Sequence, residues 1–342
     1  MAATGTIRFA SQEQWRRLLR ALAEDFELYG PEAVEGHVRL GPVEPDEVAL
    51  APARMVDPLK TVLFLAREDL GGYFGEASPP GAPPRAVVGV TACDLASLRV
   101  CDYVFLQGDV VDPHYRRRRE ATFILSQDCT EPREVCFCVG VGGQPYPTGG
   151  YDVNLSRVEG GMVLEAGTRR GQAVLEGARL PEATPEQVRE RDRRRAEVSE
   201  AVRRQAEAFG LPVQPKDFQQ SIKAGIEHPL WKRHAEACVE CGACNFICPT
   251  CHCFLLSDLE RAGRFRRFKN WDACQYEAFA RVAGGANPRP KRWERLRNRF
   301  DKKFDFFVTH VGEPACTGCG RCVEACPGRI DLREILKELV HA

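Results

Sequence analysis

The 342-residue chain has no apolar run long enough to cross a membrane and no net charge of either sign. Its longest uncharged apolar runs, such as residues 61–66, fall far short of the roughly 20 residues that a membrane span needs. Arg8, Glu13, Arg16 and Arg17 occupy the segment where a secretory signal would need an apolar core. Lys+Arg is 48 and Asp+Glu is 48, whereas a general nucleic-acid binder shows a basic excess. We therefore expect a cytoplasmic protein that neither spans a membrane nor binds nucleic acid.

The sequence also lacks the common signatures of a catalytic centre. It contains no P-loop, no H-E-x-x-H motif and no nucleophile elbow. The glycine-rich residues 140–143 (GVGG) do not match G-x-G-x-x-G, so they do not indicate a dinucleotide site. We therefore expect no catalytic residue in this chain.

Cysteine, in contrast, is abundant and clustered. Of the 16 cysteines, five lie between Cys93 and Cys138 and eleven lie between Cys238 and Cys326, whereas residues 139–237 contain none. In a reducing cytosol disulfides are rare, and cysteines serve metals or redox chemistry. The clustering therefore predicts metal binding.

The N-terminal region has the pattern of an α/β domain. We expect a helix at residues 12–24 and a surface loop at residues 77–84. Two strands are expected at residues 86–91 and 122–126, and a β-hairpin is expected at residues 151–158 and 162–167. Ser11 is the expected N-cap of the helix. Cys93 and Cys129 each follow one of the two strands within three residues. If these strands are parallel, both thiols lie at the carboxyl edge of the sheet, where such sheets bind ligands.

A long charged helix separates the two cysteine-rich regions. Residues 185–209 are highly charged, and Gly210 ends the expected helix. The interleaved Arg and Glu residues predict a salt-bridged surface helix rather than a nucleic-acid contact. We therefore expect an α/β domain at residues 1–180, this helix and a linker at residues 181–225, and a cysteine-rich domain at residues 226–342.

The cysteine-rich domain contains one motif twice. The pattern C-x2-C-x2-C-x3-C-P begins at Cys238 and again at Cys316, and it is the run that holds [4Fe–4S] clusters in bacterial ferredoxins. Three thiolates of a run converge on one cluster, and the fourth ligates the other cluster. We therefore expect one cluster on Cys238, Cys241, Cys244 and Cys326, and another on Cys316, Cys319, Cys322 and Cys248.

Two other metal chemistries explain these runs less well. Structural zinc needs four ligands, not eight cysteines in a doubled register with a proline after each run. The spacing of Cys244, Cys248 and Cys251 resembles a radical-generating motif, but Pro249 lies inside it and no series of strand–helix repeats follows. With thiolates on all four corners, no iron is open to a substrate, so such clusters move electrons.

The two runs lie too far apart in the sequence for a compact bacterial ferredoxin. The 67 residues between Cys248 and Cys316 have a mainly helical pattern. We expect helices there and after the second run, at residues 254–261, 275–282, 291–300 and 331–340. The expected fold class is therefore α+β, with an N-terminal α/β domain followed by a mainly helical, ferredoxin-like domain with two [4Fe–4S] clusters.

The remaining cysteines leave two interpretations open. Two groups stand outside the eight predicted ligands: Cys93, Cys129, Cys136 and Cys138, and then Cys251, Cys253 and Cys274. Each group either binds a further cluster or other metal, or consists of buried free thiols. Cys101, which is isolated in an apolar run, is expected to be a buried free thiol, and His252 to be a surface residue.

A basic stretch lies within the cysteine-rich domain. Residues 261–303 contain 14 Lys+Arg and 4 acidic residues, a local excess of 14 − 4 = +10. Four-thiolate clusters are anions, and nearby cations help to set their potentials. We therefore expect charge compensation or contact with an acidic partner rather than RNA binding.

Taken together, these motifs resemble the beta subunits of NAD(P)-linked sulfhydrogenases, which are cytoplasmic [NiFe] hydrogenases, and are similar to the A subunit of anaerobic sulfite reductase. The matching strings are residues 89–95 (GVTACDL), 136–138 (CFC), 228–231 (HPLW), 248–253 (CPTCHC), 271–275 (WDACQ), 283–285 (AGG) with Asn287 and Arg289, and 316–322 (CTGCGRC). They cover residues 85–330, whereas residues 1–80 match only loosely.

The resemblance implies a non-catalytic electron-transfer subunit of a hetero-oligomeric oxidoreductase. In such hydrogenases a flavin subunit exchanges hydride with NAD(P), the beta subunit carries single electrons, and small and large subunits hold the [NiFe] site. The family pattern has cysteines at the positions of Cys93, Cys129, Cys136, Cys138, Cys251, Cys253 and Cys274, which implies further ligands, and not at Cys101. FAD and NAD(P) are then expected on the partner subunit.

Three other functions remain as alternatives. The A subunit of anaerobic sulfite reductase and carriers linked to heterodisulfide reductase share these strings. A zinc-stabilised RNA-binding or scaffold protein is the alternative from another class. Iron content and the identity of the co-purifying subunits discriminate among them.

Overall fold

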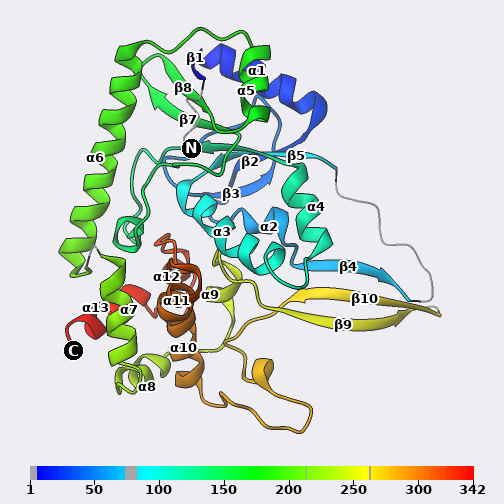
Figure 1. The fold of residues 1–342 in the computed structure, drawn as a ribbon, viewed down its shortest axis with the longest axis vertical. Helices are drawn as coiled ribbons and strands as arrows, with labels where there is room; N and C mark the ends of the chain where they lie inside the picture. The colour runs from blue at the N-terminus through cyan, green and yellow to red at the C-terminus, as the bar shows by residue number, and fades with distance from the viewer. Residues whose placement is uncertain (1–5, 74–82, 213, 262) are drawn as a thin grey trace.

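The computed structural model describes residues 6–73, 83–212, 214–261 and 263–342, and its N-terminal part forms a seven-stranded mixed sheet (Figure 1). The strand order is β1-β8-β7-β6-β5-β2-β3. The strands are β1 (Ile7–Ser11), β2 (Glu27–Val34), β3 (His37–Pro42), β5 (Arg85–Val90), β6 (Thr122–Gln127), β7 (Val153–Val158) and β8 (Gly161–Ala166). The four central strands β2, β5, β6 and β7 are parallel, and antiparallel pairs complete both edges. The strands and the hairpin predicted in this region are confirmed.

Helices cover both faces of this sheet. They are α1 (Gln12–Asp25) and α5 (Arg169–Gly177) on one face, and α2 (Lys60–Leu63), α3 (Ala92–Leu106) and α4 (Pro113–Ala121) on the other. Val88 and Phe123 belong to the core under α1, whereas Val87 and Ile124 belong to the core under α3. The two middle strands β5 and β6 are therefore buried on both faces, which agrees with their mainly apolar sequences. Ser11 caps α1 as predicted, and Gln14 completes a capping box with it.

The long helix α6 (Pro185–Phe209) runs from the sheet to a second, helical core, and Gly210 ends it as predicted (Figure 1). The helices of the second half are α7 (Pro215–Ala224), α8 (Leu230–Ala235), α9 (Ala243–Phe246), α10 (Arg292–Asp301), α11 (Phe307–Val311), α12 (Arg321–Glu324) and α13 (Leu332–Val340). Phe218, Trp231, Phe300 and Leu336 form their shared core. Leu211, which directly follows the end of α6 at Gly210, is buried in the same core. The helices predicted at residues 291–300 and 331–340 are confirmed as α10 and α13.

A three-stranded antiparallel sheet joins the two halves of the chain. It consists of β4 (Arg67–Gly72), β10 (Arg264–Trp271) and β9 (Phe254–Arg261), in the order β4-β10-β9. The helix predicted at residues 254–261 is therefore wrong. A short apolar run does not distinguish helix from strand, and pairing with β10, which itself pairs with the distant β4, selects the strand. The helix predicted at residues 275–282 is reduced to a 3-10 turn, η2 (Glu277–Ala280).

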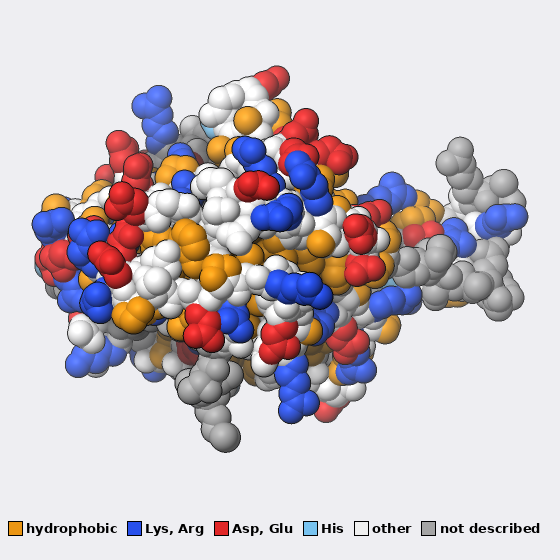
Figure 2. All heavy atoms as spheres, turned by 90° about the horizontal axis from the view of Figure 1, so that it is seen from above, with side chains coloured by type: hydrophobic (Ala, Val, Ile, Leu, Met, Phe, Trp, Pro, Cys, Tyr) orange, Lys and Arg blue, Asp and Glu red, His pale blue; other side chains and the backbone are white. Residues whose placement is uncertain are grey.

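The surface of the protein carries charges of both signs. Figure 2 shows acidic and basic side chains interspersed over one face, which agrees with the balanced composition. No helix in the described part of the chain is long and apolar enough to span a membrane. Most of the loop predicted at residues 77–84 lies outside the described residues.

Candidate metal centre

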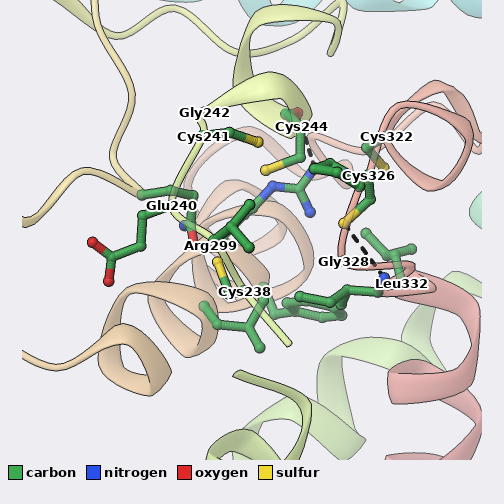
Figure 3. A pocket seen from close by; sticks show the side chains of 16 residues that line it. Cys238, Glu240, Cys241, Gly242, Cys244, Arg299, Cys322, Cys326, Gly328 and Leu332 are labelled. Atoms are coloured by element: carbon green, nitrogen blue, oxygen red, sulfur yellow. Dashed lines mark hydrogen bonds between the residues drawn. The ribbon is translucent and has the colours of Figure 1, made fainter. Parts of the chain in front are cut away.

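Three cysteines of the first run and the last cysteine of the second run line one cavity (Figure 3). These residues, Cys238, Cys241, Cys244 and Cys326, are the set predicted for the first cluster. The tight loop of the run depends on Gly242, which has φ 74° and precedes α9. A Cβ at this position would lie 2.8 Å from Oη of Tyr276. Glycine therefore lets the run fold around the cavity.

The second run lines a neighbouring cavity together with the last cysteine of the first run. This set, Cys248, Cys316, Cys319 and Cys322, is the one predicted for the second cluster. Gly320 has φ 70° and precedes α12, just as Gly242 precedes α9. The two repeats thus share one local geometry. The structure brings each predicted set of four thiols to its own cavity, and the ligation of clusters stays a prediction.

A third cavity gathers the four cysteines of the N-terminal group. Cys93 lies in the first turn of α3 after β5, and Cys129 follows β6, which pairs with β5 in parallel. Cys136 and Cys138 come from the next loop and the start of the 3-10 turn η1 (Cys138–Val141). All four line the cavity, and Cys319 of the second run lines it too. The thiols expected at the carboxyl edge of the sheet therefore do meet.

The three cavities form a continuous series. Cys322 and Arg299 line both the first and the second cavity, and Cys319 lines both the second and the third. Neighbouring cavities therefore share a cysteine. Groups bound in them would be separated by little more than one side chain.

A buried ion pair holds the second run against the N-terminal sheet. Nη2 of Arg321 lies 2.8 Å from Oδ2 of Asp94 in α3, and the side chains are 1% and 2% exposed. Arg321 also donates to the carbonyl of Met55 at 2.9 Å. In addition, the backbone N–H of Phe137 donates to the carbonyl of Gly318 at 2.9 Å. These contacts set the third cavity beside the second.

Three buried cations surround the second cavity and the end of the first run. Lys60, Arg299 and Lys303 are 2%, 5% and 5% exposed. Their hydrogen bonds go to carbonyl, hydroxyl and thiol acceptors, and in the described part of the chain none goes to a carboxylate. Nε of Arg299 has no hydrogen-bond partner among the described residues. Because buried charges require compensation, this environment fits an anionic group such as a thiolate-held iron–sulfur cluster.

The sequence pattern indicated only two of these three cations. Arg299 and Lys303 belong to the basic stretch at residues 261–303, for which charge compensation was expected. Lys60 lies outside every motif, and its contacts with Asn245 and Cys251 join segments that are distant in the sequence, so no pattern marked it as part of a site. Other cations of the stretch pair with carboxylates, such as Lys269 with Glu68 at 2.8 Å.

Three of the buried cavity thiols are protonated when no metal is bound. Burial raises the pKa of Cys93, Cys244 and Cys316 to about 12. Iron must therefore displace protons when it binds these residues, so binding is favoured at higher pH. Among the described residues, no three His, Cys, Asp or Glu side chains form a group suited to a single metal ion.

Three further candidate ligands lie beside the first two cavities. Nδ2 of Asn245 lies 3.1 Å from Sγ of Cys274 and 3.6 Å from Sγ of Cys251. Cys253 precedes β9, and its carbonyl accepts a hydrogen bond from the N–H of Asp272. None of these three cysteines lines the cavities described above. Their role as ligands stays a prediction.

Cys101 and His252 were expected to play no part in a metal site. Cys101 is 1% exposed in the apolar core, as predicted for a free thiol, and lies 3.7 Å from the carbonyl of Pro249. His252, which was expected at the surface, is half-buried, and its ring lies near those of Phe105 and Phe307. Burial there lowers the pKa of His252 to about 4, so the ring is neutral at pH 7.

Comparisons with known proteins agree with this geometry. A family described as a 4Fe-4S dicluster domain matches residues 237–330. The beta subunit of sulfhydrogenase 2 from Pyrococcus furiosus is 30% identical over 333 residues, which cover 96% of this chain and 96% of that protein. A pyruvate-flavodoxin oxidoreductase from Rhodospirillum rubrum is 33% identical over 115 residues, 34% of this chain but 8% of that protein. No solved structure matches.

Proposed function

Because the chain belongs to the family of sulfhydrogenase beta subunits, we propose that it carries single electrons between a flavin- and NAD(P)-binding subunit and a [NiFe] hydrogenase module. The observation that carries this proposal is the series of three cysteine-lined cavities in which neighbours share a residue. Such a series suits stepwise electron transfer across the protein. The absence of a catalytic motif in the sequence agrees with a subunit that moves electrons without binding substrate.

The residues at the first two cavities suit this task. When bound there, [4Fe–4S] clusters would accept and release single electrons. The thiolates of the two runs would hold every iron and leave no position open to substrate. Cys248 and Cys319 are each only 8% exposed, so the fold keeps water away from the second cavity. Lys60, Arg299 and Lys303 offset the negative charge that burial would otherwise disfavour.

We extend the proposal to a third cluster in the N-terminal cavity. Its four cysteines, Cys93, Cys129, Cys136 and Cys138, supply a complete set of thiolates. The cavity lies beyond the second one in the series, so a cluster there would lengthen the electron path toward the sheet. Cys251, Cys253 and Cys274 remain candidate ligands beside the series.

The partner subunits are part of the same proposal. Strand β9 is the outer strand of the three-stranded sheet, and Phe254, Leu255, Leu256 and Leu259 on it are 41–56% exposed. A cluster of exposed apolar side chains on one element is typical of a protein–protein contact. This strand supports contact with another subunit of the complex.

The metal content tests the cofactors directly. Protein purified without oxygen is expected to contain about eight iron atoms per chain with two clusters and about twelve with three. Reduction with dithionite should give the electron paramagnetic resonance signals of interacting clusters. A preparation rich in zinc and poor in iron would contradict the proposal.

The electron path is tested by Cys241→Ser in the assembled complex. The variant is expected to lose hydrogen evolution driven by NAD(P)H, because one cluster of the path is disrupted. Hydrogen–deuterium exchange, which needs only the catalytic subunits, should persist. Cys101→Ser, outside the cavities, is the control and should retain both activities. If Cys241→Ser retained both activities, that cluster would not belong to the electron path. If it lost both activities, the chain would have a role in assembly of the complex.

A further inference from the structure

The cavities of the two runs differ in the cations that line them. Among the described residues, Arg299 is the only cation that lines the first cavity, whereas Arg299 and Lys303 both line the second. The second cavity is also the more deeply buried, since Cys248 and Cys319 are each 8% exposed, while Cys241 of the first cavity is exposed. Burial disfavours an anion, and a nearby cation favours it.

Lys303 is held rigidly against a predicted ligand of the second cavity. Its Nζ lies 3.3 Å from Sγ of Cys248, 2.8 Å from Oγ1 of Thr250 and 3.2 Å from the carbonyl oxygen of Ala315. These three contacts fix the ammonium group in place. Oγ1 of Thr250 lies 3.3 Å from the same Sγ, so the contact belongs to a small buried network.

The local backbone explains why this lysine points inward. Lys303 lies in η3 (Lys302–Phe306), a π-helical turn inserted between α10 and α11. Such insertions are frequent at functional sites. The preceding residue, Lys302, is exposed, and its Nζ lies 3.6 Å from the centre of the Phe306 ring. Adjacent lysines therefore occupy opposite environments on one turn.

We propose that Lys303 selectively raises the reduction potential of the cluster held by Cys248 and the second run. The inference rests on the proposed function, because it requires that cluster. A [4Fe–4S] cluster held there would take up one electron from a neighbouring cluster, which would be oxidised in the same step. The acceptor would gain one negative charge, no bond would form or break, and the ammonium group of Lys303 would keep its proton. A fixed positive charge beside a ligand sulfur in a buried site stabilises the reduced form more than the oxidised form.

The test is a redox titration of the iron-loaded full chain, followed by electron paramagnetic resonance. Lys303→Met is expected to lower the midpoint potential of one cluster and leave the other unchanged. We expect a change of at least about tenfold in its reduction equilibrium, which is about 59 mV for a one-electron step. Lys302→Met removes the same charge from the exposed side of the turn and should change neither potential.

Two further variants separate charge from packing. Lys303→Arg keeps the charge and should largely preserve the potential. Lys303→Gln loses the charge but retains a donor for Thr250 and Ala315, and it should reproduce the shift of Lys303→Met. If both neutral variants lose about four iron atoms per chain, which corresponds to one cluster, the proposal is overturned. Lys303 would then be needed to retain the cluster and not to set its potential.

The failures of the two proposals are distinguishable. Iron-loaded Lys303→Met with potentials like those of Lys302→Met would overturn only the inference on Lys303. A wild-type chain that binds no iron would overturn the proposed function and this inference together.

Discussion

The two groups of cysteines reach their cavities in different ways. In the two runs, three of the four ligands predicted for each cluster lie within seven residues of sequence, and a glycine with positive φ shapes the loop. The N-terminal group instead depends on the sheet: parallel pairing of β5 and β6 brings Cys93 and Cys129 together, and the following loop adds Cys136 and Cys138. The first arrangement is local and recognisable as a motif. The second exists only in the folded chain, so its metal site depends on packing between distant segments.

The largest expected effect comes from removing a cysteine of the N-terminal group. Cys138→Ala should lose about four of about twelve irons and keep the signals of the two ferredoxin-type clusters. Cys101→Ala is the control, since Cys101 is a buried thiol in an apolar core, and it should lose none. Iron analysis and electron paramagnetic resonance measure both. Full iron in Cys138→Ala would show that this cavity holds no cluster, and loss of all iron would show that the two groups do not form independently.

A smaller effect is expected from breaking the ion pair between the two regions. Arg321→Met leaves Asp94 buried without its partner, which should cost about 3–5 kcal/mol of the free energy of unfolding. Denaturant unfolding without oxygen measures this change. Exposed Arg16→Met should change stability by less than about 0.5 kcal/mol. The double variant with Asp94→Asn should recover part of the loss, and an additive double variant would mean that the pair does not couple the regions.

The smallest expected effect is a loss of stability on substitution of Gly318, where the second run packs closely against Cys138. A Cβ on Gly318 would lie 2.5 Å from the backbone N and Cα of Cys138, whereas a Cβ on Gly312 would meet nothing within 4 Å. Both glycines have positive φ, 65° and 85°, so alanine at either position carries the same type of backbone strain. Gly318→Ala should therefore destabilise the protein by about 1–3 kcal/mol more than Gly312→Ala. Equal melting temperatures would show that the backbones can separate at no cost.

The secondary structure with strong local signals was predictable. The helix α6, with its end at Gly210, and the central strands β5 and β6 follow the expected ranges. The strand β9 was not predictable, because its apolar residues suit a helix as well and only pairing with β10 decides between them. Local periodicity predicts where helices and strands form, but it does not predict which strands pair with one another.

The candidate site divides along the same line. The spacing of the runs predicted the two sets of four thiols that line the first two cavities. It did not indicate that Lys60 would reach the carbonyl of Cys251 from the other half of the chain, at 3.0 Å. Nor did the basic stretch distinguish buried Lys303 from exposed Lys302.

The doubled cysteine motif alone was enough to assign an iron–sulfur protein, because the geometry of a tight loop depends on residues only a few positions apart. Only the tertiary structure joins the four N-terminal thiols in one cavity and sets that cavity beside the second run. It also buries three cations that make no hydrogen bond to a carboxylate in the described part of the chain. Those features arise from contacts between segments far apart in the sequence. Burial also strengthens the electrostatic interactions of these cations, since a cation interacts far more strongly with a neighbouring charge inside the protein than in water.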